Sequence, residues 1–279
     1  MLNQSTNTTP SSLVLMKPGT DEPPFFITHG LGGDVMELSK IVEHIQTRHP
    51  VYGVQWKGLD GTEPPDNSID DMAQYFMDAI IERQNHGPYL LAGLSIGGLP
   101  MLEVAHRLVA RGEEVALLAF LDTYPHPRYW PLKCWAEVLA RRFRHHFLLL
   151  TNLPFRHAAP RLLELCKSFV GHLRSRRGAS PNPSQKVGLS DQLALQRLRE
   201  SAMEAFACYQ PPYYRGKLTI LKAEVATTFP SNPAEVWGTL ASQIEIHSIQ
   251  CNHVGLIASH ADAVAAKLSL CLEKALQKK

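Results

Sequence analysis

The feature that most restricts the fold of this chain is an alternation of short apolar runs with amphipathic stretches between residues 24 and 124. The apolar runs are short enough for buried strands, and the stretches between them have helical periodicity. Buried strands that alternate with helices form a parallel sheet covered on both faces. We expect strands at 24–29, 50–55, 88–94 and 115–122, and helices at 34–48, 68–84 and 97–111.

The strand pattern stops after residue 124 and returns near the C-terminus. The intervening part has helical patterns, and Ser190 or Asp191 is the expected N-cap of its last helix. We therefore predict an α/β domain over 21–279, interrupted by a helical insertion over about 125–210 and preceded by a flexible linker over 1–20. The later elements are expected as helices at 131–153, 160–177 and 190–209, strands at 217–224 and 244–250, and a closing helix after residue 260.

Composition limits the class of protein. A chain of 279 residues with 44% hydrophobic content can form one large α/β domain. It contains no apolar run of about 18 residues and no secretory signal pattern, so neither a membrane span nor export is predicted. The five cysteines are odd in number and lack metal-type spacing, which favours a reduced, cytoplasmic protein without structural zinc.

Charge is distributed unevenly along the chain. Residues 125–180 hold 11 Lys and Arg against two acidic residues, a net of +9, whereas residues 1–124 hold 7 against 16, a net of −9. The basic segment is a solvated helical face, a docking surface for an acidic partner or a phosphate group, or a helix that lies on an anionic membrane surface. No motif supports binding to nucleic acid.

The stretch from Gly93 to Gly97 fits the pattern G-x-S-x-G around Ser95, between an expected strand and an expected helix. In a nucleophile elbow this turn presents the serine hydroxyl, and the glycines allow the helix to approach the strand closely. The context favours a catalytic serine over a structural one. Pro100 fits the first turn of the helix, where backbone amides have no helical partners.

A serine hydroxyl needs a base, and the base needs an orienting acid. Asp122 ends the strand after the elbow, and Glu224 ends a later strand. Position alone leaves these two acids equally eligible. His253, in the loop after the last expected strand, is the best candidate for the base, ahead of His247 and His260.

The sequence "THGLGGD" follows the first expected strand. Its glycine-rich turn can aim backbone amides at an oxyanion. A dinucleotide-binding fingerprint is excluded because Val35 stands where the third glycine would be required. His29 precedes the nucleophile and is expected to be structural.

Taken together, the chain resembles the thioesterase domains that terminate nonribosomal peptide synthetases and polyketide synthases. The resemblance covers about residues 24–258, except for 128–190, and rests on "FFITHGLGGD", "VYGVQWKGLDGTEPPDNSIDDMAQYF", "GPYLLAGLSIGGLPMLEVAHRL", "EVALLAFLDTYPHP", "YQPPYYRGKLTILKAE" and "CNHVGLI". It implies an α/β-hydrolase fold in which the helical insertion forms a lid over an acyl channel.

The resemblance also implies roles for individual residues. Ser95 would be the nucleophile, His253 the base and Asp122, rather than Glu224, the acid. The backbone amides of Leu31 and Ile96 would form the oxyanion hole. Leu94 and Ile96 depart from residues common in the family, so Leu94 is a candidate substrate-binding residue.

The implied activity is release of an acyl, polyketide or peptidyl chain from a carrier protein through an acyl-Ser95 intermediate, by hydrolysis or macrocyclisation. No cofactor is expected in the domain, because the substrate arrives on the phosphopantetheine arm of the carrier. The alternatives are a carrier-independent carboxylesterase or lipase, and a binding module without turnover. Carrier docking is expected near basic residues of the lid: Arg141, Arg142, Arg144, Arg174, Arg176 and Arg177.

Overall fold

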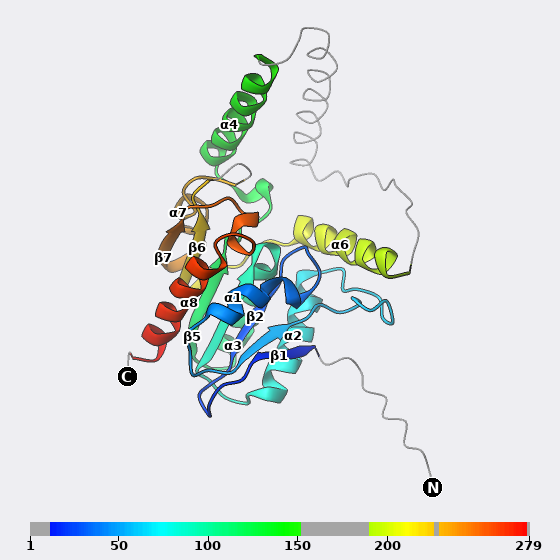
Figure 1. The fold of residues 1–279 in the computed structure, drawn as a ribbon, viewed down its shortest axis with the longest axis vertical. Helices are drawn as coiled ribbons and strands as arrows, with labels where there is room; N and C mark the ends of the chain where they lie inside the picture. Colours follow the sequence, from blue (N-terminus) through cyan, green and yellow to red (C-terminus); the bar gives the residue numbers. More distant parts are fainter. Residues whose placement is uncertain (1–11, 152–189, 226–228, 278–279) are drawn as a thin grey trace.

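A seven-stranded sheet forms the centre of the protein, in the order β1-β3-β2-β4-β5-β6-β7 (Figure 1). The computed structural model describes residues 12–151, 190–225 and 229–277. All neighbouring strands are parallel except β1, which pairs with β3 in the antiparallel sense. The strands are β1 (Leu13–Lys17), β2 (Phe25–Thr28), β3 (Val51–Val54), β4 (Tyr89–Leu94), β5 (Val115–Leu121), β6 (Tyr214–Ala223) and β7 (Ala241–Ile249).

Helices cover both faces of this sheet, so the predicted α/β-hydrolase architecture is confirmed. The α-helices are α1 (Ser39–His44), α2 (Ile69–Arg83), α3 (Gly98–Ala110), α4 (Leu132–Thr151), α6 (Ser190–Cys208), α7 (Ala234–Trp237) and α8 (Ala261–Leu276). Short 3₁₀ turns are η1 (Val35–Leu38), η2 (Ser95–Gly97), η3 (Pro127–Tyr129) and η4 (Val254–Leu256). No helix of the described residues is both long and apolar enough to cross a membrane.

The strands place alternate residues in two apolar layers. Phe26 and Phe120 pack in the layer that contains α2 and α3, whereas Phe25 and Ala119 pack in the layer with α1 and α8. All four side chains are fully buried. Since burial of a phenylalanine contributes about 2 kcal/mol relative to exposure, this alternation fixes which face each helix covers.

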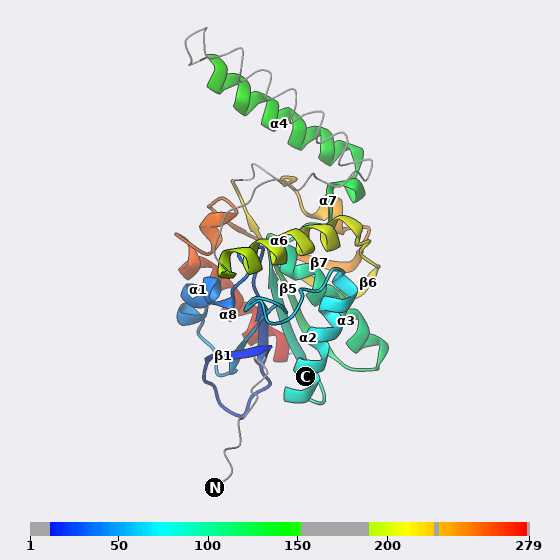
Figure 2. The same ribbon diagram turned by 90° about the vertical axis from the view of Figure 1, so that its right-hand side faces the viewer.

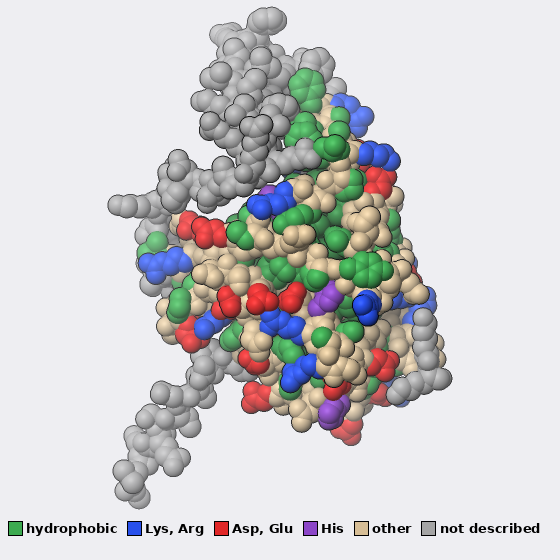
Figure 3. All heavy atoms as spheres, turned by 180° about the vertical axis from the view of Figure 1, so that it is seen from behind, with side chains coloured by type: hydrophobic (Ala, Val, Ile, Leu, Met, Phe, Trp, Pro, Cys, Tyr) green, Lys and Arg blue, Asp and Glu red, His purple; other side chains and the backbone are tan. Residues whose placement is uncertain are grey.

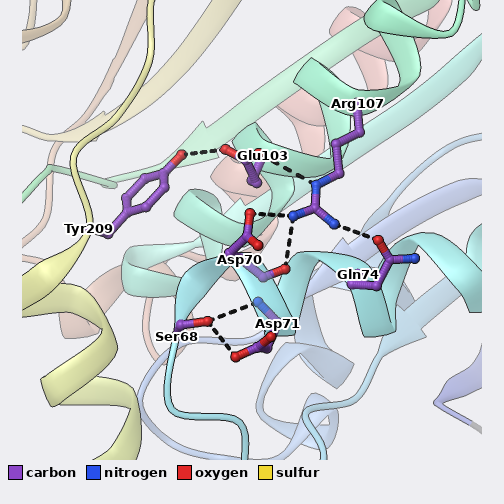
Figure 4. A network of polar contacts seen from close by, with 7 residues as sticks. All are labelled: Ser68, Asp70, Asp71, Gln74, Glu103, Arg107 and Tyr209. Atoms are coloured by element: carbon purple, nitrogen blue, oxygen red, sulfur yellow. Dashed lines mark hydrogen bonds and ion pairs between the residues drawn. The ribbon is translucent and has the colours of Figure 1, made fainter.

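Helix α2 forms within the range 68–84 that the sequence predicts, and Ser68 is its N-cap. The Ser68 hydroxyl oxygen accepts from the Asp71 amide at 3.0 Å, and the hydroxyl donates to the Asp71 carboxylate at 2.6 Å (Figure 4). The first bond satisfies an amide that the helix itself leaves without a partner, and the second fixes the hydroxyl in that position.

Arg107 of α3 connects the neighbouring helices. Its guanidinium donates to the Gln74 amide oxygen of α2 at 2.7 Å and to the Asp70 backbone carbonyl at 3.1 Å, and it pairs with the Asp70 carboxylate (Figure 4). Glu103, one turn before Arg107, accepts from the Tyr209 hydroxyl at 3.1 Å. Tyr209 directly follows α6, so this network links the end of the insertion to α3.

The N-terminal boundary predicted from the sequence is wrong in part. Residues 13–17, expected in a flexible linker, form β1, whose Leu13 pairs with Val54 of β3. This strand lies at the edge of the sheet and is only partly buried, so its sequence lacks the continuous apolar signal of the central strands. Residues 1–11 lie outside the described residues.

Two described helices belong to the insertion. Helix α4 extends away from the sheet, whereas α6 crosses over the end of the sheet (Figures 1 and 2). The helix expected at 160–177 lies outside the described residues.

On the opposite side of the molecule from the view of Figure 1, acidic and basic side chains are interspersed over the described surface (Figure 3).

Candidate active site

Ser95 lies in a tight turn between β4 and α3, as the G-x-S-x-G pattern predicts. Its φ of 53° is in the left-handed region, which an L-residue occupies at a cost. A Cβ on Gly93 would lie 2.5 Å from the Gly98 Cα, and one on Gly97 would lie 2.1 Å from the His29 carbonyl oxygen. Both glycines are therefore required for the close approach of backbone segments around Ser95.

Asp122 and His253 contact each other at the same edge of the sheet. Asp122 follows β5, and its Oδ2 lies 2.8 Å from His253 Nδ1. The other carboxylate oxygen accepts from the Ala223 amide at 3.2 Å, so the orientation of the carboxylate is fixed from two sides. The Asp122 side chain is 4% exposed and that of His253 32%, which leaves the imidazole accessible and its acid buried.

The other candidates for the acid and the base form hydrogen bonds or ion pairs with residues other than Asp122 and His253. Glu224 Oε2 lies 3.1 Å from Lys222 Nζ, and bonds to Ser248 and Lys222 lower the pKa of the Glu224 carboxyl. His247 pairs with Glu245 at 3.1 Å, and His260 Nδ1 lies 2.8 Å from the Ser259 hydroxyl. Of the two acids that position alone left open, Asp122 is therefore the one that contacts His253, whereas Glu224 bonds to Lys222.

The loop of residues 29–34, which we call the oxyanion loop, lies beside the elbow. A Cβ on Gly30 would lie 3.2 Å from Ser95 Cβ. Buried His29 contacts the Gly30 carbonyl oxygen through Nδ1 at 2.7 Å, and its Nε2 accepts from the Gln55 side-chain amide at 3.2 Å. Burial lowers the pKa of His29 to about 4, so the ring is neutral and Nδ1 carries the proton. His29 is a structural residue, as expected.

The Leu31 amide has a defined direction. It belongs to the same planar trans peptide as the Gly30 carbonyl, which is held by His29 and by the Gly33 amide at 3.4 Å. The N–H of that peptide therefore points away from His29. Within the described part of the chain, the Leu31 amide donates to no other group.

A pocket of about 330 Å³ opens at Ser95. Leu31 and Ile96, predicted to supply the oxyanion-hole amides, line it together with the serine. Leu94, predicted to bind substrate, is buried in the apolar layer of α1 and α8 and is absent from the described lining, so the structure gives this prediction no support. The remaining lining is mostly aromatic and aliphatic: Tyr124, His126, Pro127, Trp130, Trp135, Val138, Leu139, Arg142, Met203, Phe206 and Phe229.

The described arginines of the basic segment have different surroundings. Arg141 pairs with Glu137 and donates to the Phe229 carbonyl at 3.0 Å, so it connects α4 to the loop before α7. Arg142 lines the pocket, and burial lowers the pKa of its guanidinium. Arg144 is exposed. Arg174, Arg176 and Arg177 lie outside the described residues.

Sequence reasoning missed several residues of the pocket. Tyr124, His126 and Trp130 lie in the segment "DTYPHPRYW" that begins at Asp122, and its aromatic density indicates a pocket lining at that sheet edge. Phe229 packs against the His253 ring with centroids 5.2 Å apart, but no pattern in the sequence marks it. Among the described residues, no group of three or more His, Cys, Asp or Glu side chains is placed to hold a metal ion.

A parallel sheet with a serine elbow after β4, an acid after β5 and a histidine after β7 defines the α/β-hydrolase class. The sequence matches the profile of the family described as "Thioesterase domain" over residues 23–270. The chain belongs to that family.

Known relatives agree with this assignment. The chain is 36% identical over 121 residues to "Dimodular nonribosomal peptide synthase" of Bacillus subtilis (strain 168), an alignment that covers 43% of this chain and 5% of that protein. It is 30% identical over 192 residues to "Nonribosomal peptide synthetase atqA" of Aspergillus terreus (strain NIH 2624 / FGSC A1156), covering 66% and 19%. The chain thus spans only a small part of these relatives.

The fold also agrees with solved structures. The Vlm2 thioesterase domain with a bound dodecadepsipeptide superposes with a TM-score of 0.60 at 20% identity. The superposition covers 93% of this chain and 96% of that one.

Proposed function

We propose that this protein is a serine thioesterase that releases an acyl, polyketide or peptidyl chain from a phosphopantetheinyl carrier protein. The observation that carries the proposal is the Asp122–His253 hydrogen bond at the edge of the sheet. Ser95 follows a strand that ends at the same edge and lines a mostly apolar pocket there. Membership of the thioesterase domain family supports the same reaction class.

In this reaction Ser95 Oγ attacks the thioester carbonyl. His253 takes the hydroxyl proton at Nε2, because Nδ1 is held by Asp122. The amides of Leu31 and Ile96 donate to the oxygen that becomes negative. The C–S bond then breaks, the thiolate leaves with the proton from His253, and an acyl-Ser95 ester remains.

A second nucleophile completes the cycle. Water, or a hydroxyl or amine of the acyl chain itself, gives its proton to His253 and attacks the ester, and Ser95 is restored. Among the described residues no hydrogen bond joins Ser95 to His253. We expect this contact to form when substrate is bound, as catalytic contacts often tighten only then. The proposed chemistry needs no cofactor in the domain.

The pocket lining supports an acyl substrate. Tyr124, Trp130 and Phe206 present aromatic surface beside Ser95, which favours apolar groups over charged ones. Burial raises the pKa of Tyr124, and its hydroxyl donates to the Pro230 carbonyl at 3.0 Å, so its ring is fixed in place.

The carrier would dock near the lid. Among the described arginines that the sequence predicts for carrier docking, Arg144 is exposed. Arg141 instead pairs with Glu137 and donates to the Phe229 carbonyl. We therefore assign attraction of an acidic carrier to Arg144 together with the predicted residues Arg174, Arg176 and Arg177. The proposal locates the protein in the cytoplasm, consistent with unpaired thiols at Cys134, Cys208, Cys251 and Cys271.

The test compares one acyl group on a carrier protein, on free pantetheine and as a p-nitrophenyl ester. We expect kcat/KM to be highest for the carrier-bound thioester. Equal values for all three would favour the carboxylesterase alternative. Labelling of the wild type by a fluorophosphonate, lost in Ser95→Ala, excludes a binding module without turnover.

A further inference from the structure

Helix α6 of the insertion lies directly on the oxyanion loop. A Cβ on Gly33 would lie 2.4 Å from Leu195 Cδ1 and 3.3 Å from Leu198 Cδ2 of this helix. Gly33 has a φ of 92°, a conformation that strains any L-residue, and a Cβ there would displace the end of the Leu195 side chain. One turn further along, the Ser201 hydroxyl donates to the Asp66 carbonyl at 2.8 Å.

Arg199 of the same helix is bonded to the backbone of the loop. Its Nε donates to the Leu31 carbonyl at 3.0 Å, and its Nη2 donates to the Gly32 carbonyl at 3.3 Å. The planar guanidinium suits this arrangement because its donors diverge at fixed angles. Two consecutive peptides of the oxyanion loop are thereby held from the side of the lid.

Glu37 holds the loop from the other side. Its Oε1 accepts from the Gly30 amide at 2.7 Å. Burial raises the pKa of the Glu37 carboxyl above its ordinary value, and the bond from the Gly30 amide and the charge of Arg199 offset part of this rise. With the Gly30 carbonyl bonded to His29, the peptides on both sides of the Leu31 amide have fixed orientations.

We propose that Arg199 is a positioning residue for the oxyanion hole, so that α6 determines the geometry of the hole as well as covering it. The inference rests on the proposed function, because it assumes that the Leu31 amide stabilises the oxyanion. Without Arg199 the Leu31–Gly32 and Gly32–Gly33 peptides each lose their bond to the lid helix, and this part of the loop can rotate. The Gly30–Leu31 peptide then keeps its carbonyl bonds but loses the fixed neighbour on its C-terminal side, so the Leu31 amide is held less rigidly. This weakens transition-state binding more than substrate binding.

The position of α6 is itself constrained. Tyr209, directly after the helix, donates to Glu103 of α3 at 3.1 Å (Figure 4). Helix α3 begins three residues after Ser95. Helix α3 therefore contacts the end of the lid helix and also adjoins the nucleophile elbow. This common support keeps Arg199 aligned with the loop.

The test uses Arg199→Gln, Arg199→Lys and the matched control Arg197→Gln, an exposed arginine on the same helix with no described bond to the loop. With a p-nitrophenyl ester, Arg199→Gln should lower kcat about tenfold and change KM less than about twofold, a smaller loss than removal of an oxyanion donor itself. Arg199→Lys should recover part of kcat. Affinity for a boronic acid that forms a tetrahedral adduct should fall with kcat, whereas Arg197→Gln should match the wild type.

The outcomes separate the two proposals. The rate of fluorophosphonate labelling at Ser95 should also fall in Arg199→Gln, and this readout requires no knowledge of the natural substrate. Failure of the wild type to be labelled would overturn the proposed function itself. Normal wild-type labelling with unchanged kcat and boronate affinity in Arg199→Gln, or a rise in KM alone, would overturn only the role of Arg199. If Arg199→Gln does not fold, the same measurements of kcat, KM and boronate affinity on Arg199→Lys and the wild type test the role of Arg199.

Discussion

His253 Nδ1 lies 2.8 Å from Asp122 Oδ2, although 131 residues separate the two side chains along the chain. The insertion and strands β6 and β7 occupy that interval. Because β5, β6 and β7 are parallel neighbours, their carboxyl ends meet at one edge whatever the length of the insertion between them. The entropy of closing a loop rises slowly with its length, so a long insertion costs little here.

The first prediction concerns the acid. Asp122→Asn should lower kcat by about 10²- to 10⁴-fold, because the amide no longer orients the imidazole or stabilises its charged form. Glu224→Gln is the control, since Glu224 bonds to Lys222 and Ser248 instead. Steady-state kinetics of both variants shows which carboxylate orients His253. A severe loss in Glu224→Gln with little change in Asp122→Asn would contradict it.

The second prediction concerns pH and stability. His29 has a folded pKa of about 4 against an ordinary value of 6.5, so the unfolded chain binds the proton more readily. The stabilisation by neutral His29 is complete above pH 6.5 and is lost as the pH falls toward 4; by pH 5 the loss should be about 2 kcal/mol.

Denaturant titrations at pH 7.5 and 5 measure this effect. His29→Asn should be less stable than the wild type at pH 7.5, but its stability should change less between the two pH values. His126, whose pKa burial also lowers to about 4, contributes in the same direction and remains in both proteins. Identical pH dependence in the two proteins would show that His29 is not the responsible group.

The third prediction concerns packing at the elbow. Gly97→Ala places a Cβ 2.1 Å from the His29 carbonyl oxygen, and neither backbone segment can move without disturbing the sheet. The free energy of unfolding should fall by about 3 kcal/mol. Gly112→Ala is the control: its φ is 81°, but a Cβ there meets nothing within 4 Å, so only about 1 kcal/mol should be lost. Equal losses in chemical denaturation would argue against the close approach.

The fourth prediction concerns the pocket. Phe206 lines it and packs edge-on against His126 with ring centroids 5.2 Å apart. Phe206→Ala should enlarge the space beside Ser95 and raise kcat/KM for a long acyl ester over a short one by roughly tenfold. Leu132→Ala, on the exposed start of α4, should leave that ratio unchanged. An unchanged ratio in Phe206→Ala would mean that the acyl chain takes another path.

The central part of the fold could be predicted because its strands are buried on both faces. The run that contains Phe25 and Phe26 and the run around Leu91 are continuously apolar, and their spacing to the next helices leaves a parallel sheet as the consistent arrangement. Strand β1 was missed because an edge strand exposes one side, and its half-buried residues do not differ enough from those of a linker. The helix expected at 34–48 is instead a 3₁₀ turn followed by the short helix α1.

The candidate site was predictable where local sequence determines local geometry. Asp122 and His253 each follow a recognisable strand, so their contact could be expected from the sequence. Ser95 likewise follows a strand, and its role beside them stays a prediction. Glu37 and Arg199 were not predictable in this way. Their roles depend on how α6 packs against the loop. The carbonyls that Arg199 bonds lie 168 and 167 residues earlier in the chain, and no periodicity or motif encodes that contact.

The left-handed conformation of Ser95 has a consequence for the thermodynamics of the whole domain. Glycine adopts a φ of 53° without the steric cost that serine carries, so Ser95→Gly should be inactive and yet about 1 kcal/mol more stable than the wild type. Selection for stability alone would remove the hydroxyl. Retention of a serine at this position therefore marks a trade-off in which the domain gives up part of its folding free energy to keep a half-buried hydroxyl at the mouth of the pocket.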